Sequence, residues 1–239
     1  MELSLVIPMH NEAENVEPLL GEIRAALEGA ADYEVVVVDD GSDDDTPRIL
    51  ARVAAGFPRL RVIRHRTSCG QSTAIRTGVR AARGTWICTL DGDGQNDPAD
   101  IPRLWAVARE EAAEGRPLLV AGWRRSRRDT WIRRLSSRIA NGVRARLLRD
   151  ATPDTGCGLK VFRRADFLEL PYFDHMHRFL PALFLRAGGR VRSVEVHHRP
   201  RERGRSHYGI RNRLWVGIVD LLGVMWLMRR ARVPVIEEA

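Results

Sequence analysis

The segment with the clearest chemical potential is DGDGQ, in which the carboxylates of Asp91 and Asp93 are followed by the side-chain amide of Gln95. Carboxylate and amide oxygens are ligands that hard divalent cations such as Mg²⁺ and Mn²⁺ prefer. A cation held by them could neutralise a diphosphate and help it to depart as a leaving group. The apolar run at residues 85–90 precedes the segment and predicts a strand that ends there. The pattern favours a metal and diphosphate site over the alternative, a solvated Asp-Gly turn.

Two further polar segments also follow predicted strands. Residues 39–42 (DDGS) end the β-branched run at 33–38, and residues 9–12 (MHNE) end the apolar run at 3–8. A carboxylate at such a strand end can accept hydrogen bonds from a base or a ribose. A helix N-cap and turn would use the same residue types without any ligand, and both interpretations stay open at this point.

Segments of strand length alternate with segments of helical periodicity along the chain. The expected strands are residues 3–8, 33–38, 60–63, 85–90, 118–121 and 191–196, and the expected helices are residues 15–27, 46–53, 72–82 and 101–114. This alternation predicts an α/β fold with a mostly parallel sheet and helices on both faces. In open sheets of this kind, ligands bind beyond the carboxyl ends of the strands. The three polar segments fall at such ends, which predicts one shared binding site.

Several enzyme classes are disfavoured by motifs that the sequence lacks. No GxGxxG turn follows the first expected strand, which argues against a dehydrogenase, and a GxxxxGK[ST] phosphate loop is missing too. A phosphatase of the haloacid dehalogenase type normally carries its DxD motif after the first strand, whereas here the motif follows the fourth. The polar strand ends therefore call for a different chemistry.

The cysteines and the apolar stretches bear on location. Cys69, Cys88 and Cys157 fit neither a zinc site nor a disulfide framework and indicate a reduced, cytosolic protein. The N-terminus lacks the features of a signal peptide. The longest apolar stretch, Leu214–Met228, contains Asp220 and is shorter than the roughly 18–20 residues that span a bilayer. We expect this stretch to lie on a membrane or to pack as a helix.

The charge of the chain is divided unevenly. The 239 residues carry a net charge of +8, but residues 1–100 hold 10 Arg and 17 acids, whereas residues 101–239 hold 29 Lys and Arg and 14 acids. Ten arginines between positions 124 and 149 face a single acid, Asp129. This cluster predicts an anionic partner, with a solvated helix face as the alternative. Nucleic acid is disfavoured because no nucleic-acid module is recognisable and the acidic strand ends would serve no purpose there.

Together these segments carry a resemblance to a known family. VIPMHNEAEN, VVVVDDGSDDDT and TLDGDGQNDP, in that order, resemble the nucleotide-sugar domain of family 2 glycosyltransferases. DTGCGLKVFRR, HRFLPAL and HHRPRERGRSHYGIRNRLW are similar to the dolichyl- and polyprenyl-phosphate branch of that family, which includes undecaprenyl-phosphate aminoarabinose transferase. The resemblance covers residues 3–230. It implies the Rossmann-like GT-A fold with C-terminal amphipathic helices.

The resemblance also implies a single domain over residues 1–239. Within it we expect a nucleotide-sugar-binding half at 1–122, an acceptor-binding half at 123–212 and an amphipathic C-terminal segment at 213–239. The residues implied in donor binding are Pro8, Asn11, Glu12, Asp39, Asp40 and Asp91. The divalent cation, Mg²⁺ or Mn²⁺, is implied to bind Asp91, Asp93 and Gln95. Asp91, Asp93 and Asp154 are implied in catalysis, and the acceptor phosphate is implied to bind Arg124, Arg133, Ser137, Arg201 and Ser206.

The implied reaction is transfer of a sugar from a nucleotide-sugar donor to a polyprenyl phosphate, with inversion at the sugar carbon. A phosphate monoester is already an anionic nucleophile, so no general base is nominated, and arginines suit its recognition. The acceptor lipid implies a peripheral protein on the cytoplasmic face of the membrane, with a separate anchoring partner as an option. Transfer to a saccharide hydroxyl and a non-catalytic nucleotide-binding scaffold are the alternatives. The donor stays open among GDP-mannose, UDP-glucose and a UDP-linked uronic or amino sugar.

Overall fold

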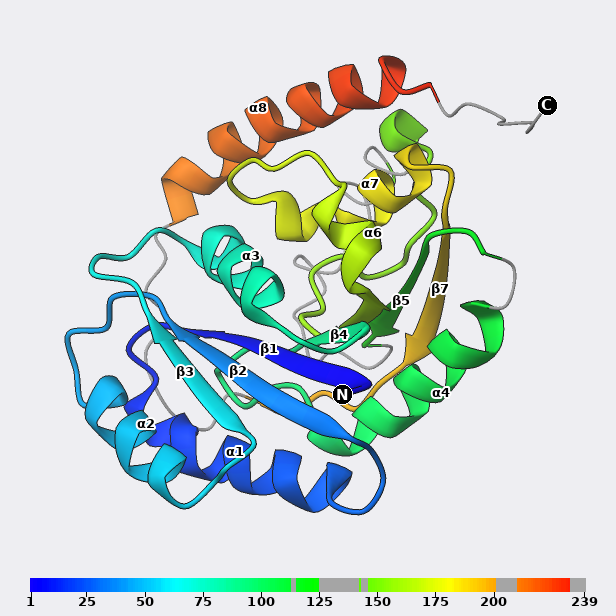
Figure 1. Cartoon of the computed structure of the whole chain (residues 1–239). Helices are drawn as coiled ribbons and strands as arrows, with labels where there is room; N and C mark the ends of the chain where they lie inside the picture. Colours follow the sequence, from blue (N-terminus) through cyan, green and yellow to red (C-terminus); the bar gives the residue numbers. More distant parts are fainter. Residues whose placement is uncertain (113–114, 125–141, 143–145, 201–209, 233–239) are drawn as a thin grey trace.

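A mixed seven-stranded sheet forms the centre of the protein (Figure 1). The computed structural model describes residues 1–112, 115–124, 142, 146–200 and 210–232. The strands are β1 (Leu3–Met9), β2 (Tyr33–Asp39), β3 (Leu60–Arg64), β4 (Trp86–Thr89), β5 (Leu118–Trp123), β6 (Lys160–Arg163) and β7 (Arg190–Glu195), in the spatial order β3-β2-β1-β4-β6-β5-β7. Neighbours are parallel except that β6 runs antiparallel to both β4 and β5. The predicted mostly parallel sheet is confirmed.

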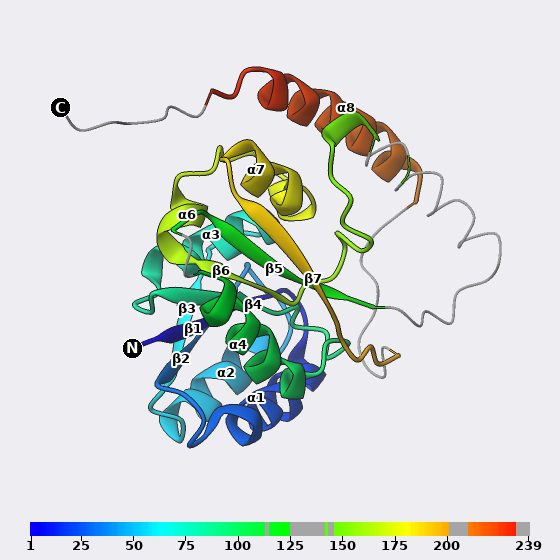
Figure 2. The same cartoon turned by 90° about the vertical axis from the view of Figure 1, so that its right-hand side faces the viewer.

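Helices cover both faces of this sheet, as the alternating pattern predicted. They are α1 (Ala13–Leu27), α2 (Thr46–Ala55), α3 (Gln71–Ala81), α4 (Ile101–Glu111), α6 (Arg164–Leu168), α7 (Leu180–Arg186) and α8 (Ile210–Arg229), with short 3₁₀ turns η1 (Pro98–Asp100) and η3 (Met176–Arg178). Figure 2 shows α1, α2 and α4 on one face and α3, α6 and α7 on the other, with α8 as an outer layer beyond α7. Each face has its own buried apolar core.

Strand β1 shows why these runs became central strands. Leu3, Leu5 and Ile7 belong to the core on the α1 face and Val6 to the core on the α3 face, and all four are fully buried. A strand covered on both faces needs apolar side chains at successive positions. Burial of each such side chain contributes about 1.5–3 kcal/mol, which fixes the strand in the interior.

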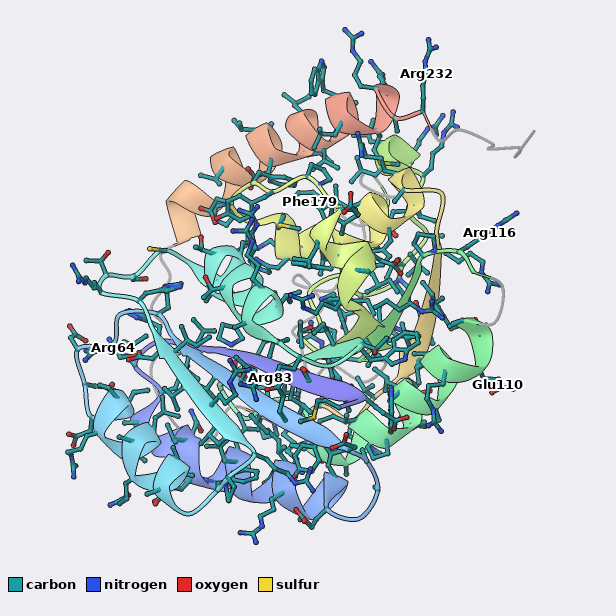
Figure 3. The ribbon with its side chains drawn as sticks, in the orientation of Figure 1. Arg64, Arg83, Glu110, Arg116, Phe179 and Arg232 are labelled. Carbon is teal, nitrogen blue, oxygen red and sulfur yellow. The ribbon has the colours of Figure 1, made fainter. Side chains whose placement is uncertain are left out.

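Helix α8 is buried along one side only. Val224 is 1% exposed and packs into the core on the α3 face, with Leu221 and Met225 partly buried beside it. Figure 3 shows Phe179 inside this layer, whereas Arg232 projects away from the protein beyond the end of α8. Among the described residues, no helix is both long enough and apolar enough to cross a membrane.

The sequence pattern missed one strand and overextended one helix. It predicted no strand at Lys160–Arg163, because this run has only four residues with a cation at each end and shows no alternation. Helix α4 ends at Glu111, and residues 113–114 of the helix expected at 101–114 lie outside the described residues. The division into a donor half, an acceptor half and a C-terminal segment stays a prediction.

Candidate functional site

The carboxyl ends of β2, β1 and β4 lie next to each other at one edge of the sheet, and the three polar segments meet there. Met9 pairs with Asp39 in the parallel register, and the backbone N–H of Asp40 donates to the carbonyl of Met9 at 2.8 Å. On the other side of β1, the N–H of Leu90 donates to the carbonyl of Val6 at 3.2 Å, just before Asp91. The predicted convergence of these segments is confirmed.

Hydrogen bonds fix the loop after β1 against the loop after β2. The side-chain amide of Asn11 donates to Asp43 at 2.6 Å and its carbonyl accepts from the Asp43 N–H at 3.0 Å. Asn11 has a positive φ of 56°, a conformation in which asparagine is enriched. The N–H of Glu12 donates to the hydroxyl of Thr46 at 3.0 Å. Two residues implied in donor binding, Asn11 and Glu12, are thus held in place before any ligand arrives.

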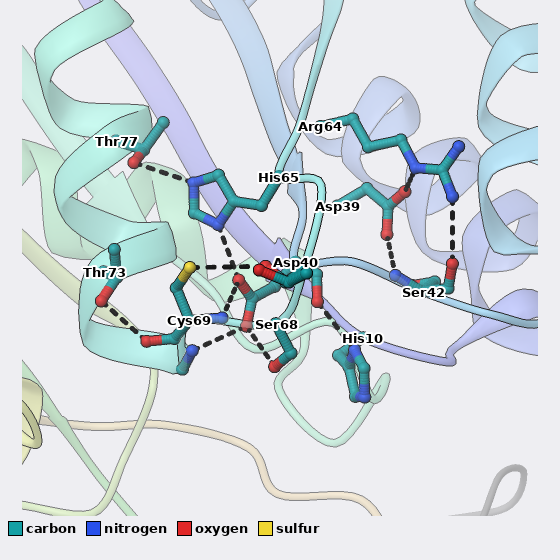
Figure 4. Close-up of polar contacts among 12 residues, drawn as sticks. His10, Asp39, Asp40, Ser42, Arg64, His65, Ser68, Cys69, Thr73 and Thr77 are labelled. Carbon is teal, nitrogen blue, oxygen red and sulfur yellow. Dashed lines mark hydrogen bonds and ion pairs between the residues drawn. The ribbon is translucent and has the colours of Figure 1, made fainter.

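The carboxylate of Asp40 organises the loop that leads into α3 (Figure 4). It accepts hydrogen bonds from the N–H groups of Cys69 at 2.9 Å and Gly70 at 2.8 Å, and from the hydroxyl of Ser68 at 2.9 Å. The Nδ1 of His65 lies 2.6 Å from it. Burial alone would raise the pKa of Asp40, but these hydrogen bonds lower it below the ordinary value. Asp40 is therefore a satisfied structural carboxylate.

Asp40, His65 and Cys69 also bring potential ligand atoms within 4.8 Å of one another, as in a metal site. The hydrogen bonds of Asp40 already explain this closeness. The second ring nitrogen of His65 is bonded to the hydroxyl of Thr77 at 3.0 Å, and Cys69 is exposed. The cluster therefore serves as the anchor of the loop between β3 and α3.

Asp39 lies beside Asp40 but is less completely bonded. Its Oδ1 accepts from the N–H of Ser42 at 3.0 Å. Its Oδ2 lies 3.1 Å from Nε of Arg64, an ion pair without hydrogen-bond geometry (Figure 4). Asp39 is also fully buried. Its role in donor binding stays a prediction.

Beside Asp91 lies a cavity of about 310 Å³. Its wall is formed by Gln71, Ile75, Thr89, Leu90, Asp91, Thr155, Gly156, Cys157, Gly158, Lys160, His177, Arg178 and Leu180. The side-chain amide of Gln71 donates to Asp91 at 2.8 Å. A Cβ at Gly158 would collide with the Asp91 carboxylate, so only glycine allows this close approach. The cavity thus opens directly onto the first carboxylate of the DGDGQ segment.

The electrostatics at Asp91 fit a bound cation. Burial and the nearby negative charge of Asp93 raise the pKa of Asp91 to about 6, although Lys160 and Arg124 act in the opposite direction. A divalent cation relieves the repulsion between two neighbouring carboxylates. Carboxylate oxygens and the amide oxygen of Gln95 are the type of ligand that Mg²⁺ and Mn²⁺ prefer. The residues present therefore suit the predicted metal.

Asp93 and Gln95 are further tied to the segment after β7. The N–H of Gln95 donates to Asp93 at 3.1 Å, and the carbonyl of Gln95 accepts from the N–H of Arg199 at 3.0 Å. The Arg199 guanidinium pairs with Asp97 and with Glu22 of α1, each at 2.8 Å. These contacts fix the conformation of the segment that would hold the metal.

Arg124 and Asp154 form one buried unit. The Nε and Nη2 of Arg124 donate to the two oxygens of Asp154 at 2.7 and 3.0 Å. Burial lowers the pKa of Arg124, but the hydrogen bonds and charge of Asp154 raise it overall. The resemblance implied separate roles for the two residues, Arg124 in the acceptor phosphate site and Asp154 in catalysis. Arg133, Ser137, Arg201 and Ser206, the other residues implied in the phosphate site, lie outside the described residues.

Asp91 is the one residue of this cavity wall that was predicted as a site residue; those that were missed include Gln71, Lys160, His177 and Arg178. One signal was available in the sequence, because Lys160 is the only lysine among 39 Lys and Arg residues. Burial lowers the pKa of Lys160, and it also lowers the pKa of His177 to about 3, so that His177 is neutral near pH 7.

Comparison with known proteins establishes the family. Residues 4–170 match the model of glycosyl transferase family 2. The chain belongs to this family. It is 37% identical over 235 residues to dodecaprenyl-phosphate galacturonate synthase of Rhizobium johnstonii, covering 96% of this chain and 68% of the relative. It is 36% and 37% identical to the undecaprenyl-phosphate 4-deoxy-4-formamido-L-arabinose transferases of Edwardsiella ictaluri and Pseudomonas fluorescens, covering 87% and 93% of this chain but 63% and 64% of theirs. The chain thus spans about two thirds of the length of these relatives.

Solved structures confirm that this family 2 glycosyltransferase has the GT-A fold. Glucosyl-3-phosphoglycerate synthase from Mycobacterium tuberculosis, in complex with Mn²⁺, UDP and glucosyl-3-phosphoglycerate, superposes with a TM-score of 0.67 at 21% identity, covering 98% of this chain and 81% of that one. S. aureus TarS in complex with UDP-GlcNAc superposes with a TM-score of 0.66 at 15% identity, covering 98% and 68%. The enzyme class expected from the sequence, a glycosyltransferase, is confirmed by the family.

Proposed function

We propose that this family 2 glycosyltransferase transfers a sugar from a nucleotide-sugar donor to a polyprenyl phosphate, with inversion of the anomeric carbon. The observation that carries the proposal is the Asp91 carboxylate, two residues before Asp93, in the wall of a cavity that also includes the buried cation Lys160. The three sequence relatives support the acceptor class, since their names specify a dodecaprenyl or undecaprenyl phosphate.

The chemistry follows from the charges of the two substrates. An oxygen of the lipid phosphate attacks the anomeric carbon, a new C–O bond forms, and the bond to the donor diphosphate breaks on the opposite face. The nucleoside diphosphate leaves with the electron pair. A divalent cation held by Asp91, Asp93 and Gln95 would supply neutralisation of that diphosphate. Because the phosphate nucleophile is already ionised, the site needs no general base.

The chain's own residues bind and orient the two anions. Asn11 and Glu12 lie in the hydrogen-bonded loop at the end of β1. They are proposed to meet the nucleoside, together with Pro8 and Asp39, whereas Asp40 holds the adjoining loop in place. Arg124 is proposed to meet the acceptor phosphate, with Asp154 holding its guanidinium in one orientation. Asp154 is thus a positioning residue in this proposal.

We further propose that α8 docks the enzyme on the cytoplasmic face of the membrane. Val219, Leu222 and Trp226 are 55%, 59% and 59% exposed and recur at helical spacing on α8. Arg229 and Arg230 follow them at the end of the helix, and both are exposed. An apolar helix face beside basic residues inserts between anionic lipid headgroups. A partner that anchors the enzyme would add to this contact.

Reconstitution tests the proposed function. Purified enzyme is incubated with undecaprenyl phosphate in vesicles, labelled UDP- and GDP-sugars and either Mg²⁺ or Mn²⁺. We expect a labelled lipid that runs as a sugar monophosphate ester of the polyprenol. Transfer only to a saccharide would support the hydroxyl-acceptor alternative. Donor binding in a thermal-shift assay without product on any acceptor would support a non-catalytic scaffold.

A further inference from the structure

The single lysine of this arginine-rich chain lies in the cavity wall, at the first position of β6. Lys160 is 4% exposed and pairs in register with Thr89 of β4, two residues before Asp91. Its ammonium group donates to the carbonyl of Cys157. Within the described residues it forms no ion pair with a carboxylate. A buried ammonium with one hydrogen bond retains further N–H donors, and its desolvation costs several kcal/mol unless an anion compensates it.

A second cation, Arg178, also lines this cavity. Arg178 belongs to η3. His177 of η3 and Leu180 at the start of α7 also line the cavity. No hydrogen bond or ion pair joins the Arg178 guanidinium to another described side chain. His177 is neutral, and its Nδ1 is bonded to the hydroxyl of Ser72 at 2.8 Å. The cavity therefore presents two cations and one carboxylate, Asp91.

That carboxylate is already committed. Asp91 accepts a hydrogen bond from Gln71, and in the proposed function it also faces the cation. With a neutral sugar in the cavity, the charges that offset that of Lys160 are those of Asp91 and Asp154, which the proposed function pairs with the metal and with Arg124. A carboxylate on the sugar would pair with it, and would favour the charged form of the lysine against the burial that lowers its pKa. The cavity volume, about 310 Å³, is at the small end of the range for ligand pockets, about 300–1,000 Å³.

We propose that this cavity is the subsite of the transferred sugar and that Lys160, with Arg178, selects a sugar that carries a carboxylate, a uronic acid. The inference rests on the proposed function for the location of the donor diphosphate at Asp91 and Asp93. Lys160 acts here on donor specificity. The nucleophile and the leaving group are the same for an acidic and a neutral sugar.

Paired donors that differ only at the sixth carbon test this specificity. The pairs are UDP-galacturonate with UDP-galactose, UDP-glucuronate with UDP-glucose, and GDP-mannuronate with GDP-mannose. We expect the wild-type enzyme to show a higher kcat/KM for the acid in at least one pair. Lys160→Met is expected to lower that preference about tenfold to a hundredfold, the range for one charged hydrogen bond. Lys160→Arg should keep part of the preference because it keeps the charge.

Two further variants separate specificity from general damage. Arg83→Met removes an exposed cation remote from the cavity and should leave the acid-to-neutral ratio as in the wild type (Figure 3). Arg178→Gln should lower the ratio by a smaller factor than Lys160→Met, because Arg178 is only partly buried. It also provides the test if Lys160→Met fails to fold.

The outcomes are distinguishable from failure of the proposed function. Equal losses for acidic and neutral donors in Lys160→Met, or a rise in the KM of the polyprenyl phosphate alone, would overturn the assignment and place Lys160 at the acceptor phosphate. A wild-type preference for the neutral sugar in every pair would also overturn it. If no donor yields a lipid product, the proposed function fails, and the same pairs are compared by thermal shift with metal. Tighter binding of an acid that is lost in Lys160→Met would still support the subsite.

Discussion

The buried carboxylates at the carboxyl ends of β2 and β4, Asp40 and Asp91, have opposite environments. At the end of β2, Asp40 is surrounded by donors from Ser68, Cys69, Gly70 and His65, and its pKa is lowered. At the end of β4, Asp91 has one side-chain donor, Gln71, and a raised pKa. The first carboxylate is satisfied by the protein itself, whereas the proposed function assigns the second to a bound cation. The comparison distinguishes a carboxylate that stabilises the loops of the site from one that is proposed to bind a ligand.

The largest effect should come from removing the second metal carboxylate. Asp93→Ala is expected to lower transfer by at least about a hundredfold, as loss of one electrostatic group at a reacting centre does. Initial rates of labelled lipid formation measure this effect, and a thermal melt of the variant checks that it folds. Full activity of the wild type in excess chelator would contradict the metal role.

Asp40→Ala should instead act on stability. It leaves two backbone N–H groups and the side chains of His65 and Ser68 without their acceptor, and breaking such a buried network costs about 3–5 kcal/mol. Denaturant unfolding of Asp40→Ala and the wild type measures the loss. Asp91→Asn is the matched comparison, because it removes a buried charge that the protein disfavours, and we expect no comparable destabilisation. Equal destabilisation of the two variants would remove the distinction between the two ends.

A third expectation concerns pH. Burial, followed by the charges of Arg178, Lys160 and His175, lowers the pKa of His177 from 6.5 in the unfolded chain to about 3 in the fold. Between these values the unfolded state binds more protons, so stability falls as the pH falls below about 6.5, by up to about 1.4 kcal/mol per pH unit. Chemical denaturation at a series of pH values measures the slope. His177→Asn should flatten it, and an unchanged slope would assign the pH dependence to other groups.

The smallest effect on stability is expected on the exposed face of α8. Leu222→Glu lies on a surface that contacts no core, so the free energy of unfolding should change by only about 0.5 kcal/mol. Binding to anionic vesicles, measured by co-sedimentation, should weaken clearly. Exposed Arg48→Gln on α2 is the control, because it changes the net charge by the same −1. Equal loss of vesicle binding in both variants would argue for a general electrostatic attraction rather than insertion of α8.

The sequence by itself determined the elements and the edge at which they act. Continuous apolar runs such as residues 3–8 and 33–38 encode strands buried on both faces. The carboxyl ends of parallel strands lie at one edge of the sheet. The convergence of residues 9–12, 39–42 and 91–95 therefore followed from the local pattern alone. Packing decided the rest. Lys160 reaches the cavity only because the four-residue β6 inserts antiparallel between β4 and β5, and Arg124 meets Asp154 across 30 positions. Such contacts depend on which strands become neighbours, a long-range property that local periodicity does not encode.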